Sequence, residues 1–133
     1  MHSRIEGRGV TSSPNPSLTV AEMARATGLT ADTLRYYERI GVLHAVARAV
    51  SGHRRYDAND VDWMAFVLRL KRIGMPLKQI RHYAQLRERG DATLRARQEL
   101  LESHEHWLVA QLDDLGEHLA ALRDKLDWYR KQT

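Results

Sequence analysis

The sequence predicts a mostly α-helical fold, in which a winged helix-turn-helix domain is followed by a long dimerising coiled-coil helix. Two short helical patterns joined at Gly28, and a basic segment with a Ser-Gly turn, predict the first part. Leucines that recur every seven residues in the last third of the chain predict the second part. We therefore expect one unit built around a core and another built around an apolar seam.

The chain of 133 residues divides into three expected parts. Residues 1–16 are rich in Ser, Pro and Gly, and the letters IEGR at 5–8 resemble a protease cleavage site. We expect this part to be a disordered leader or expression tag. We expect the winged helix-turn-helix domain at 17–90 and the long helix at 91–133.

The first helix is predicted to begin after Thr19 and to end at Gly28. Thr19 and Glu22 have the spacing of a capping box, in which each side chain accepts a hydrogen bond from the other residue's backbone amide. Glycine at the end of a helix tolerates the left-handed backbone of a C-terminal cap. These signals predict a short, well-delimited helix.

A second helix is predicted over 31–39, capped by Thr30 and closed by Gly41. Its helical period turns Leu34 and Tyr37 toward the interior. The opposite face then carries Arg35, Tyr36 and Arg39.

The stretch 43–56 has no helical period and contains the Ser-Gly turn, so we expect a short two-stranded wing there. Asp57 is placed to cap a third helix that runs to about Ile73. Pro76 is placed to start a fourth helix, where its missing amide costs nothing. The residues of the third helix expected to face inward include Val61, Met64, Ala65, Leu68 and Ile73.

One long helix is predicted from about Thr93 to Lys131. At about 1.5 Å per residue it extends on the order of 60 Å, and its single narrow apolar stripe needs a partner. A second copy of the chain is the simplest partner, although heptads alone do not decide between parallel and antiparallel pairing. The predicted dimer interface consists of Leu101, Leu108, Leu112, Leu115, Leu119, Leu122 and Leu126.

The composition excludes several classes of site. The chain has no cysteine, which removes disulfides, thiolate metal sites and cysteine nucleophiles. No apolar run reaches the roughly 18 residues of a membrane span. No nucleophile motif, phosphate loop or paired-acid pattern is present, so we expect neither an enzyme nor a cofactor. His104 and His106 are two residues apart and face different ways on a helix, so we expect no metal site.

The charge distribution points to a polyanion as partner. The net charge is +4, and the excess of Lys and Arg lies within 17–90. Basic side chains release counterions when they approach phosphates, so nucleic acid is the expected ligand. Two other classes stay open: a coiled-coil adaptor whose basic front binds an acidic protein, and an architectural protein that binds DNA without sequence preference.

The run Leu-Arg-Tyr-Tyr-Glu at 34–38, followed by the Ser-Gly turn and Arg54-Arg55-Tyr56, resembles the MerR family of bacterial transcription regulators. The resemblance is close over residues 17–90. The long helix resembles the family in its type of structure. It implies a cytoplasmic, nucleoid-associated homodimer with antiparallel helices. It also implies that the dimer binds double-stranded promoter DNA on an overlong spacer and distorts it, so that RNA polymerase reaches both promoter hexamers.

The outward faces and the resemblance together give a set of candidate DNA contacts. Arginine and tyrosine on the second helix suit base edges and phosphates in the major groove. Alternation along a strand places Arg54 and Tyr56 on one face and Arg55 on the other, and Tyr56 has a structural role as its alternative. Arg39 has an ion pair with Glu38 or Asp32 as its alternative. The full set is Thr30, Thr33, Arg35, Tyr36, Arg39, His53, Arg54, Arg55, Tyr56, Lys71 and Lys78.

The C-terminal part resembles the small-tailed MerR group associated with aldehyde and nitrosative stress. Members of that group often carry a cysteine in the third helix, and the corresponding position here is Arg69. A thiol reaction therefore does not carry over, and with the chain ending at Thr133 we expect no separate ligand domain. A small-molecule effector stays open: either weak, reversible binding near Trp107 and Trp128 at the dimer junction, or none.

Overall fold

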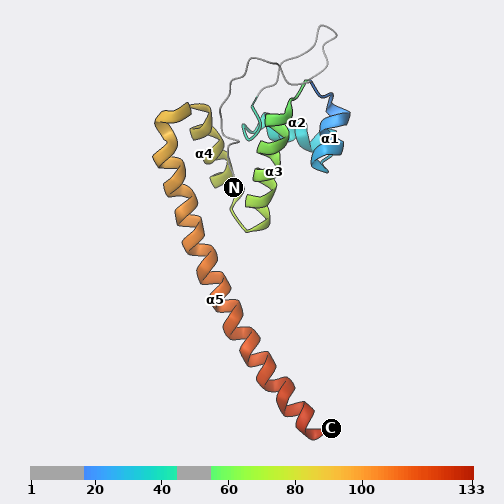
Figure 1. Cartoon of the computed structure of the whole chain (residues 1–133), viewed down its shortest axis with the longest axis vertical. Helices are drawn as coiled ribbons and strands as arrows, with labels where there is room; N and C mark the ends of the chain where they lie inside the picture. Colours follow the sequence, from blue (N-terminus) through green and yellow to red (C-terminus); the bar gives the residue numbers. More distant parts are fainter. Residues whose placement is uncertain (1–16, 45–54) are drawn as a thin grey trace. The chain divides into compact units, whose positions relative to one another are not determined.

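The structure, a computed structural model, describes residues 17–44 and 55–133. The chain divides into two compact units, Met1–Thr93 and Leu94–Thr133. All regular elements longer than a single β-bridge in the described residues are helical, which confirms the mostly α-helical fold class (Figure 1). The turn of the predicted wing lies outside the described residues.

The first two helices, α1 (Val20–Thr27) and α2 (Ala31–Arg39), have the predicted caps. The Thr19 amide donates to Glu22 Oε1 at 2.8 Å and the Glu22 amide donates to Thr19 Oγ1 at 3.1 Å, so the capping box is confirmed. The hydrogen bond from the Thr19 amide lowers the pKa of Glu22, because it favours the charged carboxylate.

The turn between α1 and α2 depends on Gly28. This residue has a φ of 79°, in the left-handed region, and its amide donates to the Ala24 carbonyl oxygen at 2.8 Å. Thr30 then caps α2 through a hydrogen bond of 3.1 Å from the Thr33 amide. A side chain at Gly28 would be strained by the backbone angle alone, so the glycine fixes how α2 leaves α1.

The third helix, α3 (Ala58–Arg72), begins with a second capping box between Asp57 and Asp60, with both hydrogen bonds at 3.0 Å. The predicted inward face is partly wrong. Met64 is fully buried, but Ala65 is exposed and Val61, Leu68 and Ile73 are only half-buried. The helix is apolar on several faces, so the sequence period did not single out one stripe. The residues that α3 buries in the core are Trp63, Met64, Val67 and Leu70.

The fourth helix, α4 (Leu77–Glu88), starts one residue later than predicted, because Pro76 is its N-cap. A one-turn 3₁₀ helix, η1 (Gly90–Thr93), follows it. The Thr93 hydroxyl donates to the carbonyl oxygens of Leu86 at 2.6 Å and Gly90 at 2.8 Å, which closes the end of α4.

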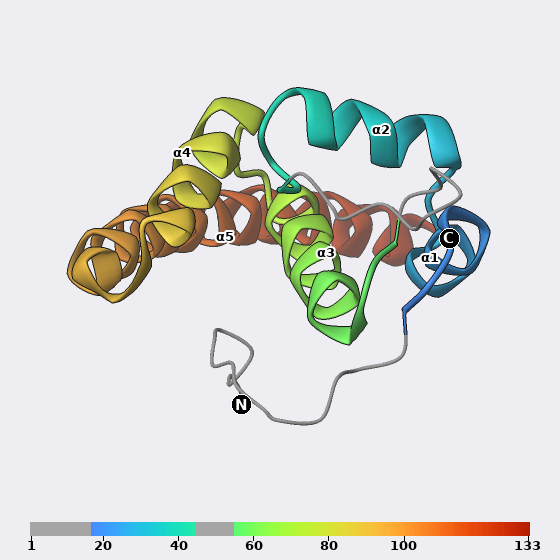
Figure 2. The same ribbon diagram turned by 90° about the horizontal axis from the view of Figure 1, so that it is seen from above.

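The core of the first unit lies between its four α-helices, where α1 packs against α2 and α3, and α3 packs against α4 (Figure 2). Two strand-like residues, Leu18 and Tyr56, form an isolated antiparallel β-bridge beside α1. The aromatic rings of Trp63 and Tyr83 stack with centroids 5.8 Å apart. Aliphatic residues complete this core, with Met23, Leu34, Leu43, Met64, Val67 and Ile80 all 0% exposed.

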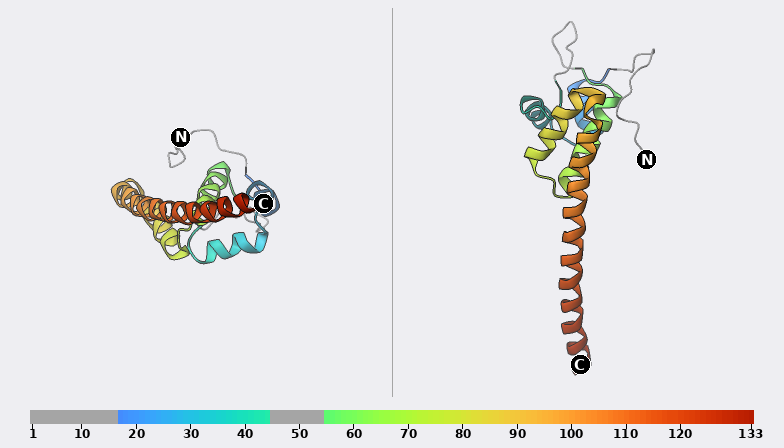
Figure 3. Two further views of the ribbon diagram at one scale, coloured as in Figure 1. Left: turned by 90° about the horizontal axis from the view of Figure 1, so that it is seen from below. Right: turned by 90° about the vertical axis from the view of Figure 1, so that its left-hand side faces the viewer.

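The second unit is the helix α5 (Leu94–Gln132), which is 39 residues long. Figure 3 shows it as one unbroken helix, and Gly116 does not interrupt it. The long helix predicted from the heptad pattern is therefore confirmed. None of the helices in the described part of the chain has the length and apolar character needed to cross a membrane.

Candidate nucleic-acid interface

The helix α2 presents one buried face and one charged face. Leu34 is 0% exposed and Tyr37 is 3% exposed, so both lie in the core as predicted. The other side of the helix carries residues spaced three, four and seven positions apart, which is the spacing of one helical face. These residues are Asp32, Arg35, Tyr36 and Arg39. A cationic, aromatic face on a helix anchored by its opposite side suits insertion into a DNA groove.

Contacts along this face order its long side chains. Arg35 forms an ion pair with Asp32, with Nη2 and Oδ1 2.5 Å apart, while 40% of the Arg35 side chain stays exposed. The Arg39 guanidinium lies 5.7 Å from the centre of the Tyr36 ring. Within the described residues Arg39 thus contacts an aromatic ring, and Asp32 pairs with Arg35 instead. An exposed pair of this kind contributes little stability, so Arg35 remains available to DNA.

Thr30 and Thr33 lie at the N-terminus of α2. The Thr30 hydroxyl donates to the Thr33 hydroxyl at 3.0 Å and accepts from the Thr33 amide. Helix N-termini and hydroxyls commonly contact phosphates, because the first amides of a helix are directed toward an approaching anion. The two threonines therefore lie at the end of α2 where a contact with a DNA phosphate is most favourable.

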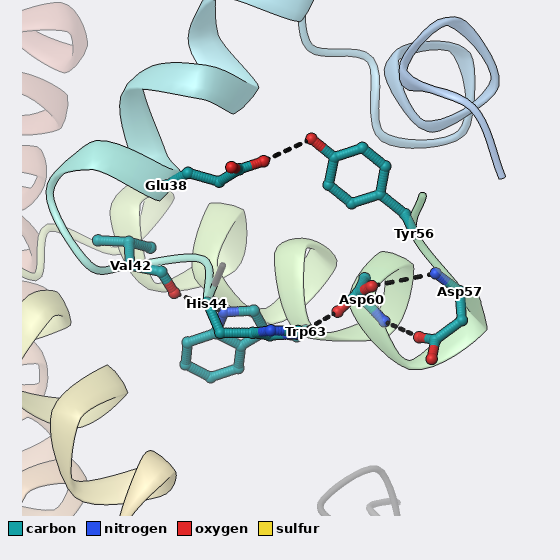
Figure 4. Close-up of polar contacts among 7 residues, drawn as sticks. All are labelled: Glu38, Val42, His44, Tyr56, Asp57, Asp60 and Trp63. Carbon is teal, nitrogen blue, oxygen red and sulfur yellow. Dashed lines mark hydrogen bonds and ion pairs between the residues drawn. The ribbon is translucent and has the colours of Figure 1, made fainter. Parts of the chain in front are cut away.

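Tyr56 is not placed as an exposed wing contact. Its side chain is 2% exposed, and its hydroxyl donates to Glu38 Oε2 at 2.7 Å (Figure 4). Its backbone pairs with Leu18 through hydrogen bonds of 2.6 and 2.8 Å. The structural alternative left open by the sequence is the one observed, because burial leaves Tyr56 no surface for DNA.

The remaining wing candidates divide between described and undescribed residues. His53 and Arg54 lie outside the described residues. Arg55 is half-buried, and its positive charge is one cause of the lowered pKa of Glu22, after the hydrogen bonds from Thr19 and the charge of Arg25. Successive side chains of extended backbone point to opposite sides, so Arg55 is directed away from the core that holds Tyr56.

A second polar cluster holds the backbone that follows α2 (Figure 4). The Trp63 indole donates to the Val42 carbonyl oxygen at 2.8 Å from a buried position. His44 Nε2 lies 2.8 Å from Asp60 Oδ1, the carboxylate that also closes the capping box of α3. These contacts hold the backbone that follows α2 against the first two turns of α3.

Two cations from α3 and α4 reach the C-terminal end of α2. Lys71 Nζ donates to the Tyr37 hydroxyl at 3.1 Å, and Arg81 Nε donates to the Ile40 carbonyl oxygen at 2.9 Å. Positive charge is favourable at a helix C-terminus because of the helix dipole. Lys78 is exposed and lies three residues before Arg81 on the same helix. Arg81 was missed by the sequence reasoning, although its spacing from Lys78 was an available signal.

Comparison with known proteins places this arrangement in a family. The description "MerR HTH family regulatory protein" matches residues 18–87, and the description "MerR, DNA binding" matches residues 61–129. The HTH-type transcriptional regulator AdhR of Bacillus subtilis is 37% identical over 92 residues. That match spans 69% of this chain and 66% of AdhR, just under two thirds of its length.

Two solved structures resemble the chain over most of its length. One, described as a MerR family transcriptional regulator from Listeria monocytogenes, has a TM-score of 0.79 and 37% identity, covering 85% of this chain and 86% of its own. The other is HiNmlR, a MerR family regulator described as lacking the sensor domain and bound to promoter DNA. It has a TM-score of 0.75 and 34% identity, covering 87% of this chain and 92% of its own.

Proposed function

The chain belongs to the MerR family of DNA-binding transcriptional regulators, and we propose that it binds promoter DNA as a homodimer and controls transcription by distorting the promoter. The observation that carries the proposal is the face of α2 that holds Arg35, Tyr36 and Arg39 outward while Leu34 and Tyr37 anchor the helix in the core. The DNA-bound relative with 34% identity supports the same use of the fold.

In the proposed complex α2 enters the major groove. Arg35 supplies a guanidinium that can bond a guanine edge at two atoms or clamp a phosphate, and Tyr36 supplies a hydroxyl and an apolar ring face. Thr30, Thr33 and Arg39 contact the phosphates on either side. The α2 face thereby provides the sequence-specific part of the affinity.

Phosphate contacts outside α2 set the register of the domain on the duplex. Arg55, with His53 and Arg54, contributes from the predicted wing, and Tyr56 is not proposed as a contact because it is buried. Lys71 and Lys78 contribute from the ends of α3 and α4. We add Arg81 to this group. Its Nε atom donates to the Ile40 carbonyl oxygen at the end of α2, and the residue is exposed.

The proposed dimer forms through α5. The leucines of its second half expose between 40% and 64% of their surface in the single chain: Leu112, Leu115, Leu119, Leu122 and Leu126. Leu101 and Leu108 extend the same seam. A stripe of this length is buried most simply against the same stripe of a second copy, and the family implies an antiparallel pair.

A dimer with two DNA-binding domains explains how promoter distortion is possible. Bending a duplex costs on the order of a few kcal/mol, and contacts at two half-sites offset that cost. We propose that the domain at 17–90 makes these contacts, that 91–133 pairs the copies, and that the bent spacer becomes readable to RNA polymerase. The site of action is then the bacterial cytoplasm, at the nucleoid.

The chain carries no cysteine, so effector sensing through a thiol is not part of the proposal. Either a small molecule binds reversibly and weakly, or the regulator works without one, and we favour the second. We propose that residues 1–16 are a leader or an expression tag.

The proposal is tested by sequencing the genomic DNA fragments that the purified protein retains. Recovery of a shared inverted repeat, bound with an affinity that falls steeply as salt rises, is the expected result. Retention of DNA with no shared sequence would indicate an architectural protein, and retention of none would indicate an adaptor that binds protein.

A further inference from the structure

A part-buried hydrogen bond joins the DNA-reading helix α2 to the end of the predicted wing. Glu38 lies on α2 between Arg35 and Arg39, and its carboxylate accepts the Tyr56 hydroxyl at 2.7 Å. The two residues are 18 positions apart in the chain. A hydrogen bond to a charged acceptor is stronger than a neutral one, and burial of Tyr56 strengthens it further.

The backbone of Tyr56 is fixed by a different element. Leu18, just before α1, donates to and accepts from Tyr56 at 2.6 and 2.8 Å. The Tyr56 ring therefore lies in the core, its hydroxyl is bonded to α2 and its backbone is bonded to Leu18. The neighbouring Arg55, on the opposite side of the same extended backbone, takes its position from them.

The backbone that leaves α2 is fastened as well. His44 contacts Asp60 at 2.8 Å and Val42 accepts from the Trp63 indole at 2.8 Å, and both partners belong to α3 (Figure 4). The Glu38–Tyr56 contact differs from these, because its acceptor is a side chain of α2 itself.

We propose that Glu38 and Tyr56 are positioning residues, which touch no DNA and fix the distance between the base-reading face of α2 and the wing cation Arg55. The inference rests on the proposed function, because it assumes that α2 and Arg55 contact the same duplex. A binding surface made of two elements works only when supporting side chains hold both in register. Loss of the contact releases Arg55 from the phosphate while Arg35 stays in the groove.

The test is a double-mutant cycle between Tyr56→Phe and Arg55→Ala on the duplex recovered by selection. Tyr56→Phe removes one oxygen atom and keeps the ring in the core. We expect a roughly tenfold loss of affinity. The slope of log affinity against log salt should fall by about one phosphate contact. Arg55→Ala should cause a similar loss in the parent and little further loss in the Tyr56→Phe background.

Three further variants separate positioning from loss of stability. Tyr83→Phe removes the hydroxyl of another buried tyrosine in the same unit and should leave the salt slope unchanged. Glu38→Gln keeps an oxygen that can accept the tyrosine hydroxyl, so it should restore most of the affinity that Glu38→Leu loses. Thermal unfolding shows that each variant is folded, and if Tyr56→Phe is not, Glu38→Leu takes its place in the cycle.

The inference is overturned if Tyr56→Phe binds like the parent, or if Arg55→Ala costs the same in both backgrounds. A parent protein that selects no duplex at all would overturn the proposed function instead, so the two failures are told apart.

Discussion

The two units of the chain differ in what they do with their apolar side chains. In the first unit Leu34, Met64 and Ile80 are each 0% exposed, whereas Leu112 and Leu115 of α5 are 61% and 64% exposed. Burial of apolar surface is worth roughly 25 cal/mol per Å² and is the main favourable term in folding. The first unit therefore obtains its stability within one chain, and α5 obtains much of its stability only when its seam is covered.

The difference assigns separate tasks to the two units. The first unit holds charged side chains on a rigid frame, as the face of α2 with Arg35, Tyr36 and Arg39 shows. In the proposed dimer, the second unit pairs two copies of the chain, so that two first units are held together. The proposed recognition of an inverted repeat needs both units, and a substitution in either unit should affect it in a different way.

The largest expected effect is loss of the dimer. Leu115→Asp places a charge in the middle of the α5 seam, where pairing would bury it without a partner. The variant should sediment as a monomer, and its operator affinity should fall by more than about 100-fold, because the second half-site is no longer bound as part of one complex. Ala110→Asp, which adds the same charge on the opposite side of α5, is the matched control and should dimerise. A monomeric parent at micromolar concentration would contradict the assignment of α5.

A change in the core of the first unit should act differently. Met64→Ala removes a fully buried side chain of α3 and should lower the free energy of unfolding by about 2–5 kcal/mol. This loss should not depend on protein concentration. Leu112→Ala in the exposed seam should instead cause a loss that shrinks as the protein is diluted below the dissociation constant of the parent dimer, because a monomeric parent gains nothing from the seam. Denaturant unfolding at several concentrations measures this dependence. Equal concentration dependence in the two variants would remove the distinction between the units.

A substitution on the outward face of α2 should leave the fold of both units intact. Arg35→Ala should weaken binding to the selected operator by about 1–3 kcal/mol and relax the preference at one base position. Binding titrations and a repeated selection measure the two effects. Arg89→Ala, an exposed arginine at the end of α4, serves as the control. Parent-like affinity of the Arg35→Ala variant would take this residue out of the interface.

A smaller effect is expected at the cap of α1. Thr19→Ala removes the hydroxyl that accepts from the Glu22 amide at 3.1 Å and should cost about 1 kcal/mol of stability. The lowered pKa of Glu22 adds a pH dependence to this region. A carboxyl with a lowered folded-state pKa stabilises above its unfolded pKa, and the stabilisation is lost as the pH falls through the folded value. Acid unfolding should therefore separate parent and Glu22→Gln less than unfolding at neutral pH, and a constant separation would contradict this role of Glu22.

No effect on operator binding is expected from a reagent that modifies thiols. A nitrosothiol should leave no mass adduct and should not change operator affinity, because the chain has no thiol. A stable adduct at one residue that alters DNA binding, seen by mass spectrometry and titration together, would show that covalent sensing uses another side chain.

Local signals in the sequence predicted the helices well. The capping box at Thr19, the left-handed Gly28 and the N-cap Thr30 each involve residues within four positions of one another, so their geometry follows from short-range spacing. The extent of α5 also followed from the heptad leucines. The inward face of α3 did not, since Val61, Ala65 and the other apolar residues around the helix give it no single stripe.

The candidate site was predictable where it lies on a helix face and not where it depends on distant partners. The exposed face of α2 follows from the positions of Leu34 and Tyr37. The burial of Tyr56 does not, because alternation along a short strand says which residues share a face but not which face is inside. Contacts such as Lys71 to Tyr37, 34 residues apart, leave no local pattern in the sequence.

The central claim, that two first units joined by α5 read one inverted repeat, is tested most directly by sedimentation of the protein with its selected duplex. The account predicts two chains per duplex, and a large loss of affinity when one half-site is scrambled. A single chain per duplex, with the same affinity for the intact and the half-scrambled sequence, would contradict it.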